Sequence, residues 1–134
     1  MNFYNAAPLL LIFPIIGVVI NGFFTRQLVE ADPKSGEKIS GWFGSAMAIS
    51  CFLVAFLLLL SLRANDYHAE VIPLFQWMYI PIQGFESFNI PWAMQVDTLS
   101  VTMMLVVTGV GSLIHIYAIG YMHGDPNFSR FFAY

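Results

Sequence analysis

Three long stretches of the chain are almost free of charged side chains. Their charged residues lie only at one end of each stretch: Arg26 in the first, Arg63 in the second and Asp97 in the third. The stretches cover residues 6–26, 41–63 and 97–122. An α-helix rises about 1.5 Å per residue, so about 20 apolar residues cross the roughly 30 Å of hydrocarbon in a bilayer. Each stretch is therefore predicted to be a transmembrane helix.

The composition also points to the membrane. Hydrophobic residues make up 58% of the 134 residues and charged residues only 10%, whereas soluble domains contain about 25% charged residues. This excludes a soluble globular domain, and the high hydrophobicity excludes intrinsic disorder. The five basic residues form no cluster, which argues against nucleic acid as a partner and leaves the lipid bilayer as the expected surroundings. The predicted fold class is an all-α integral membrane protein.

One face of the second stretch carries only small side chains. Small residues let the backbone of another helix approach closely in a membrane. This face is therefore predicted to pack against a neighbouring helix. Its members are Gly41, Gly44, Ser45 and Ala48.

The connection over 64–96 is rich in aromatic residues, unlike a flexible linker. Its runs 75–80 and 88–96 have the composition of strands and are separated by Gly84. We predict a small β-hairpin that lies at the membrane interface, where the rings of Trp and Tyr are favoured. Alternatively, the aromatic rings merely cover the helix ends. These rings belong to Trp77, Tyr79 and Trp92.

The distribution of basic residues predicts the orientation in the membrane. Four of the five lie on one side, at or near the segments 27–40 and 127–134, and Arg63 alone lies on the other. Since Lys and Arg resist translocation, 27–40 and the C-terminus are expected inside and the N-terminus outside. Residues 1–5 lack the basic residues of a secretory signal, so the first helix is expected to be retained. Residues 127–134 are predicted to start a further helix.

Three polar residues of the third stretch are candidates for a proton path. Thr108, Ser112 and His115 follow one another at spacings of four and three, which places them on one side of a helix. His115 is expected about 8 Å beyond the helix midpoint, on the inner side. Ionisable groups at membrane depth often mark ion routes, and histidine titrates near neutral pH. The alternative is a neutral histidine that bonds to a carbonyl group of a neighbouring helix.

Charged residues at the ends of the third helix are expected to be structural. Asp97 is suited to cap the helix, because a carboxylate in the first turn accepts unpaired backbone N–H groups. Asp125 precedes Pro126 in a turn signal and is expected to pair with Arg130. No Cys or His spacing suits a metal ion, and no nucleophile lies beside a base. We therefore predict no catalytic residue within the chain.

The last part of the chain resembles a known family. From Asp97 it reads DTLSVTMMLVVTGVGSLIHIYAIGYMHGDPNFSRFFAY, with TGVGSLIHIY over 108–117 as its most distinctive run. This sequence is similar to the N-terminal region of subunit L, or chain 5, of NADH:quinone oxidoreductase, which is respiratory complex I. The other distinctive parts are 97–100, 120–122, 125–126 and 130–134.

The resemblance implies a function in proton transport. Subunits of this family resemble cation/proton antiporters and move protons when quinone reduction elsewhere in the complex drives them. The family's central glutamate and buried lysines would lie beyond residue 134, so no catalytic or transport centre is expected within this chain. Other membrane-arm subunits of complex I would be its partners. NADH, FMN, iron–sulfur clusters and quinone would be bound by other subunits.

Two other functions stay open at this point. The chain could belong to the large subunit of a multisubunit sodium/proton antiporter or of a related membrane-bound hydrogenase, since these share the antiporter-like domain. It could also be a small membrane protein with a structural role. The start of the chain lacks the Arg-rich pattern of a transit peptide, so a bacterial plasma membrane is expected rather than a mitochondrial inner membrane.

Overall fold

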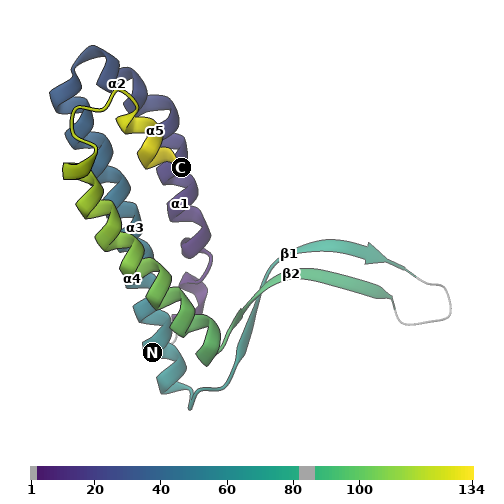
Figure 1. Ribbon diagram of the computed structural model, residues 1–134. Coiled ribbons are helices and arrows are strands. Elements are labelled where there is room, and N and C mark those ends of the chain that lie inside the picture. Colours follow the sequence, from purple (N-terminus) through teal and green to yellow (C-terminus); the bar gives the residue numbers. More distant parts are fainter. Residues whose placement is uncertain (1–2, 82–86) are drawn as a thin grey trace.

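Three long apolar helices and one β-hairpin make up the protein (Figure 1). The computed structural model describes residues 3–81 and 87–134. The helices over Tyr4–Ala31, Pro33–Ala64 and Thr98–Tyr121 are long and apolar enough to cross a membrane. The elements in chain order are η1 (Tyr4–Ala6), α1 (Leu9–Val19), η2 (Ile20–Thr25), α2 (Arg26–Ala31), α3 (Pro33–Ala64), β1 (Glu70–Ile80), β2 (Phe88–Val96), α4 (Thr98–Tyr121) and α5 (Phe128–Ala133). The prediction of a mainly helical membrane protein with a small hairpin is confirmed.

Successive long helices run in opposite directions. In Figure 1, the N-terminus, the end of α3 and the hairpin lie at one end of the bundle, and α2, the start of α3 and α5 lie at the other. The short helix α5 turns back into the bundle and packs against η2 and α3. Helix α3 contacts both α1 and α4 and is therefore the central element. We call the end that carries α2 and α5 the basic end, because Lys34 and Lys38 lie there.

The connection expected over 27–40 is itself helical. Asp32 alone interrupts the helix, with an extended backbone (φ −142°, ψ 95°), because the residue before a proline disfavours the helical region. Pro33 then occupies the first turn of α3, where its missing N–H group needs no partner. The apolar pattern predicted only residues 41–63 of this helix, because hydropathy detects the part that lies in the hydrocarbon of the membrane. The polar first turns of α3 extend the helix beyond the hydrocarbon.

The first helix contains an irregular segment. In η2 the chain forms a π-helix, whose wider turn is common at functional sites. Two polar residues of this segment, Asn21 and Thr25, are buried. Both side chains face into the bundle, where α3 and α5 supply hydrogen-bond partners.

The hairpin has the strands that its composition predicts. Strand β2 begins and ends at the predicted residues 88 and 96, while β1 begins at Glu70, before the predicted run 75–80. The strands pair antiparallel, from Glu70 opposite Val96 to Ile80 opposite Phe88. The predicted turn residue Gly84 lies outside the described residues. The hairpin projects away from the helices (Figure 1).

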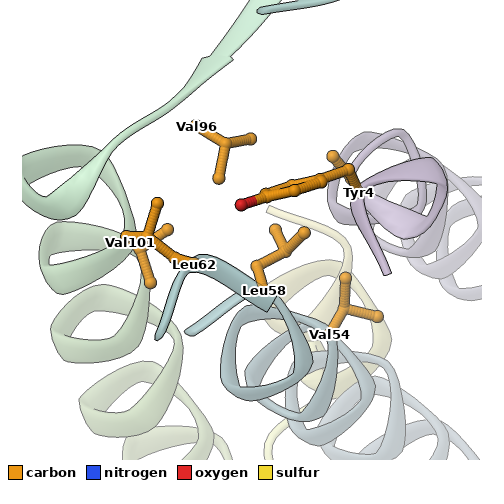
Figure 2. Packing of buried hydrophobic residues seen from close by; sticks show 7 residues of the cluster. Tyr4, Val54, Leu58, Leu62, Val96 and Val101 are labelled. Carbon is orange, nitrogen blue, oxygen red and sulfur yellow. The ribbon is translucent and has the colours of Figure 1, made fainter. Parts of the chain in front are cut away.

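A cluster of buried apolar side chains closes the bundle at the hairpin end. Figure 2 shows the Tyr4 ring between Val96 and Leu58, with its hydroxyl group pointing towards the side on which Leu62 and Val101 lie. Val96 ends the hairpin and Val101 belongs to the first turns of α4, so this cluster fixes the base of the hairpin to the helices. It contains Tyr4, Ala7, Val54, Leu58, Leu62, Val96 and Val101.

The small residues of α3 form a packing face, as predicted. A Cβ atom added at Gly41 would lie 2.9 Å from Ile119 of α4 and 3.2 Å from Phe128 of α5. One added at Gly44 would lie 3.0 Å from Phe132. Larger side chains would therefore push α4 and α5 away from α3.

Candidate functional site

A buried network of polar side chains joins three segments of the bundle. Asn21 is fully buried and donates from Nδ2 to the carbonyl oxygen of Phe132 at 3.2 Å. Its Oδ1 accepts hydrogen bonds from the hydroxyl groups of Ser40 (3.1 Å) and Thr25 (3.2 Å). Thr25 also bonds to the backbone carbonyl of Asn21 at 2.9 Å. The network thus connects η2 with α3 and α5 through groups that lipid could not satisfy.

A buried carboxylate at the basic end connects α3 with the segment after α4. The side chain of Glu37 is 9% exposed, and its Oε2 lies 2.7 Å from Nδ1 of His123. The backbone N–H of Gly124 also points at this oxygen, at 3.4 Å. Sequence reasoning missed this pair. A signal existed, because Glu37 precedes Gly41 by one helical turn and so continues the small-residue face that packs against α4.

His115 lies half-buried on α4 with one ring nitrogen already bonded. Its Nδ1 is 2.8 Å from the carbonyl oxygen of Gly111, one turn earlier in the same helix. A carbonyl oxygen only accepts hydrogen bonds, so Nδ1 carries the proton in the neutral ring and Nε2 is left as an acceptor. The ring packs edge-on against Phe132, with centroids 6.0 Å apart. The histidine is thus bonded to its own helix, whereas a carbonyl group of a neighbouring helix was the alternative expected from sequence.

The predicted polar stripe is divided between two sides of α4. Thr108 and His115 both line a cavity of about 320 Å³, together with residues of α1, α3 and the end of the chain. Ser112 is buried and faces a separate apolar groove that Ile49 and Phe52 of α3 also line. Helical geometry explains the division, since three residues rotate the side-chain direction by about 300°, which leaves Ser112 about 60° from His115.

The hydroxyl groups of the stripe bond to the backbone of α4. Thr108 donates to the carbonyl oxygen of Met104 at 2.5 Å, and Ser112 donates to that of Thr108 at 2.6 Å. Each hydroxyl oxygen keeps lone pairs that can accept a further hydrogen bond. The cavity therefore offers acceptors from Thr108 and from Nε2 of His115 within otherwise mainly apolar walls.

Asp97 caps α4. Its Oδ1 accepts the backbone N–H of Ser100 at 2.7 Å, and the Ser100 hydroxyl accepts the backbone N–H of Asp97 at 2.9 Å. Hydrogen bonds to the carboxylate, chiefly the one from the Ser100 backbone N–H, hold the pKa of Asp97 below its ordinary value of 3.8. A lowered carboxyl pKa stabilises the fold at pH values above 3.8, and this contribution is lost as the pH falls through the lowered pKa.

Asp125 and Arg130 do not pair as expected. Oδ1 of Asp125 accepts the backbone N–H of Asn127 at 2.7 Å, which closes the turn before α5. Among residues 3–81 and 87–134, the ion pairs are Arg26 with Glu30 and His123 with Glu37. The local turn hydrogen bond involves less side-chain ordering than an ion pair with the long, exposed Arg130 side chain.

Three apolar helices that bury hydrogen-bonded polar groups define this chain as an integral membrane protein. The family described as "NADH-Ubiquinone oxidoreductase (complex I), chain 5 N-terminus" matches residues 79–132. The chain belongs to this family of complex I chain 5 and subunit L proteins, as the resemblance of residues 97–134 predicts.

Similar proteins come from bacteria and fungi. The chain is 34% identical over 125 residues to NADH-ubiquinone oxidoreductase chain 5 of Hypocrea jecorina, covering 93% of this chain and 16% of that protein. It is 36% identical over 130 residues to NADH-quinone oxidoreductase subunit L of Escherichia coli, covering 97% of this chain and 19% of that protein. Subunit L of Mycobacterium tuberculosis is 36% identical over 102 residues, or 74% of this chain and 16% of that protein. The chain thus spans less than a fifth of each of these relatives.

Proposed function

We propose that this chain is the N-terminal part of the antiporter-like, proton-translocating membrane subunit of NADH:quinone oxidoreductase. The family match over residues 79–132 carries this proposal. The apolar helices support it, because each is long enough to cross the bilayer. In this function the protein couples quinone reduction to proton transport. Quinone reduction occurs in other subunits, which also bind NADH, FMN and the iron–sulfur clusters.

Within that subunit, we infer that the cavity beside His115 belongs to the proton route. Nε2 of His115 accepts a proton from a water molecule in the cavity, and the Thr108 hydroxyl group bonds to the same water chain. The bond from Nδ1 to Gly111 supports this arrangement, because it holds the ring in one tautomer with Nε2 unprotonated. Ser112 faces the other groove and bonds to Thr108 within α4, so it takes no part in the route.

Replacement of His115 tests this proposal in the full-length subunit. His115→Leu is expected to lower the proton-to-electron ratio while NADH:quinone electron transfer decreases less, because leucine fills the space of the ring but cannot carry a proton. The ratio is measured in vesicles that contain the assembled complex.

His115→Gln distinguishes a proton relay from a structural histidine. Glutamine can still donate to the Gly111 carbonyl oxygen, but it does not titrate near neutral pH. A relay predicts that both variants lose pumping, whereas a structural histidine predicts that glutamine restores it. Wild-type ratios in both variants at normal assembly would exclude the relay.

The proposed partners are other membrane-arm subunits of the complex. The hairpin supports this, because its large apolar side chains are exposed on both strands and a two-stranded hairpin is only marginally stable by itself. We place the hairpin at the membrane interface, where Trp77, Tyr79 and Trp92 lie at the level of the lipid headgroups. A neighbouring subunit covers its apolar surface.

The proposed orientation places the basic end on the cytoplasmic or matrix side and the hairpin on the opposite side. The bacterial plasma membrane as the location is part of this proposal, and the relatives come from both bacteria and fungi. Ser35 is exposed at the basic end, and His68 is exposed between α3 and β1. In intact bacterial cells, a membrane-impermeant thiol reagent is expected to label His68→Cys, and Ser35→Cys only after permeabilisation. The reverse labelling pattern would show the opposite orientation, and the buried native Cys51 provides the background control.

A further inference from the structure

A second cavity lies at the basic end, away from His115. It has a volume of about 460 Å³ and lies between the first turns of α3 and the end of α4. Lys34, Lys38 and Trp42 line it from α3, at spacings of four that place them on one face of the helix. Ile119 lines it from α4, and Phe128 lines it from α5. No part of the proposed proton route uses these side chains.

The two lysines give this cavity a positive charge. Both side chains are exposed, and neither forms an ion pair with any residue in the described part of the chain. The other ionisable groups at the cavity are Glu37 and His123. The carboxylate of Glu37 is buried and bonded to His123, so it is not paired directly with either lysine. The cavity therefore keeps a net positive charge, and both ammonium groups can contact an anion.

The rest of the cavity is apolar and suits a hydrocarbon chain. Trp42 is 60% exposed, and Ile119 and Phe128 form apolar walls. Trp42 directly follows Gly41, where the uncharged stretch of α3 begins, so it lies at the boundary between headgroups and hydrocarbon. One turn before it, Lys38 lies on the polar side of that boundary. The cavity thus has a cationic part at the level of the lipid headgroups and an apolar part at the level of the acyl chains, which matches the two parts of a phospholipid.

We propose that this cavity binds one anionic phospholipid. The lipid phosphate lies between the ammonium groups of Lys34 and Lys38, and an acyl chain runs along Trp42 and Ile119 towards the membrane centre. Inorganic phosphate would satisfy the lysines alone and leave the apolar walls uncovered. An anionic lipid satisfies both parts, and basic residues beside a membrane attract such lipids by about 1 kcal/mol each.

Photo-crosslinking of the assembled complex tests this site. The complex is reconstituted in phosphatidylcholine vesicles that contain a trace of either phosphatidylglycerol or phosphatidylcholine with a diazirine in the acyl chain. After illumination, lipid adducts are located by mass spectrometry of peptides. We expect the phosphatidylglycerol probe to modify residues 34–42 or 119–128 up to about thirtyfold more than the phosphatidylcholine probe, as two nearby cations imply.

A pair of matched variants separates a specific site from general surface charge. Lys34→Gln combined with Lys38→Gln is expected to lower phosphatidylglycerol labelling at these residues to the level of phosphatidylcholine. Arg26→Gln combined with Arg130→Gln removes the same charge from the same end, outside the cavity, and is expected to leave the labelling unchanged. All four side chains are exposed, so normal assembly is expected and is verified by subunit content.

Several results would overturn the lipid site. Equal labelling by the two probes would show that the lysines select no anionic lipid. An equal loss in both double variants would show general surface attraction. Displacement of the phosphatidylglycerol probe by inorganic phosphate would show a site for free phosphate, and no labelling by either probe would show that protein covers the cavity. None of these results bears on the His115 experiment, so the two proposals fail independently.

Discussion

Gly36→Ala is expected to destabilise the contact between α2 and α3 by about 3 kcal/mol. A Cβ atom at this position would lie 2.6 Å from the backbone N and Cα atoms of Val29 and 2.8 Å from the carbonyl carbon of Leu28. These are main-chain atoms, so no side-chain rotation can relieve the overlap. The two helices must separate, and the buried Val29 side chain loses its packing. Thermal unfolding of the purified full-length subunit in detergent measures the effect.

Gly120→Ala is the matched control for Gly36→Ala. It lies in α4, and a Cβ atom there would meet no other atom within 4 Å. Alanine favours a helix over glycine by about 1 kcal/mol, so this variant is expected to be as stable as the wild type or slightly more stable. If Gly36→Ala unfolded at the same temperature as Gly120→Ala, the close approach of α2 to α3 would be wrong.

Asn21→Leu is expected to destabilise the protein by about 2 kcal/mol. The substitution breaks three side-chain hydrogen bonds, to Thr25, Ser40 and the Phe132 carbonyl group. Polar contacts between membrane helices contribute about 0.6 kcal/mol each on average, and leucine leaves the buried carbonyl oxygen of Phe132 without the Asn21 donor. Leucine has the same branched side-chain skeleton but larger methyl groups, so the substitution leaves no cavity. We expect α5 to detach first, since Phe132 belongs to it.

Two further variants calibrate this effect. Ser40→Ala removes one bond to Asn21 and is expected to cost a third as much, or about 0.6 kcal/mol. Asn65→Leu changes an exposed asparagine at the end of α3 and is expected to stay within about 0.5 kcal/mol of the wild type. Equal unfolding temperatures for Asn21→Leu and Asn65→Leu would show that the network makes no net contribution. Limited proteolysis follows the expected detachment of α5, and in that case cleavage at residues 127–134 would be as slow in Asn21→Leu as in the wild type.

Features that depend on local chemistry could be predicted from the sequence. The apolar helices follow from transfer free energies summed over consecutive residues, and no distant contact is needed to place them. The cap of α4 likewise depends on Asp97 and Ser100, which are three residues apart. Strand β2 follows from its β-branched and aromatic composition, and the packing face of α3 follows from the helical repeat of small residues.

Contacts between distant segments were decided only by the tertiary structure. Glu37 meets His123 across 86 positions and Asn21 meets Phe132 across 111, and such pairs depend on how the helices cross and turn. Helical rotation separates Ser112 from His115 by about 60°, but the position of α3 against α4 decides that the two residues line different cavities. Hydropathy alone could not place the start of α3 either, because Pro33 and the polar turn after it continue the helix beyond the hydrocarbon. The sequence by itself thus determined which segments are apolar and which helix ends are capped. Tertiary packing determined which polar side chains meet, because their pairing requires a geometry that no local pattern encodes.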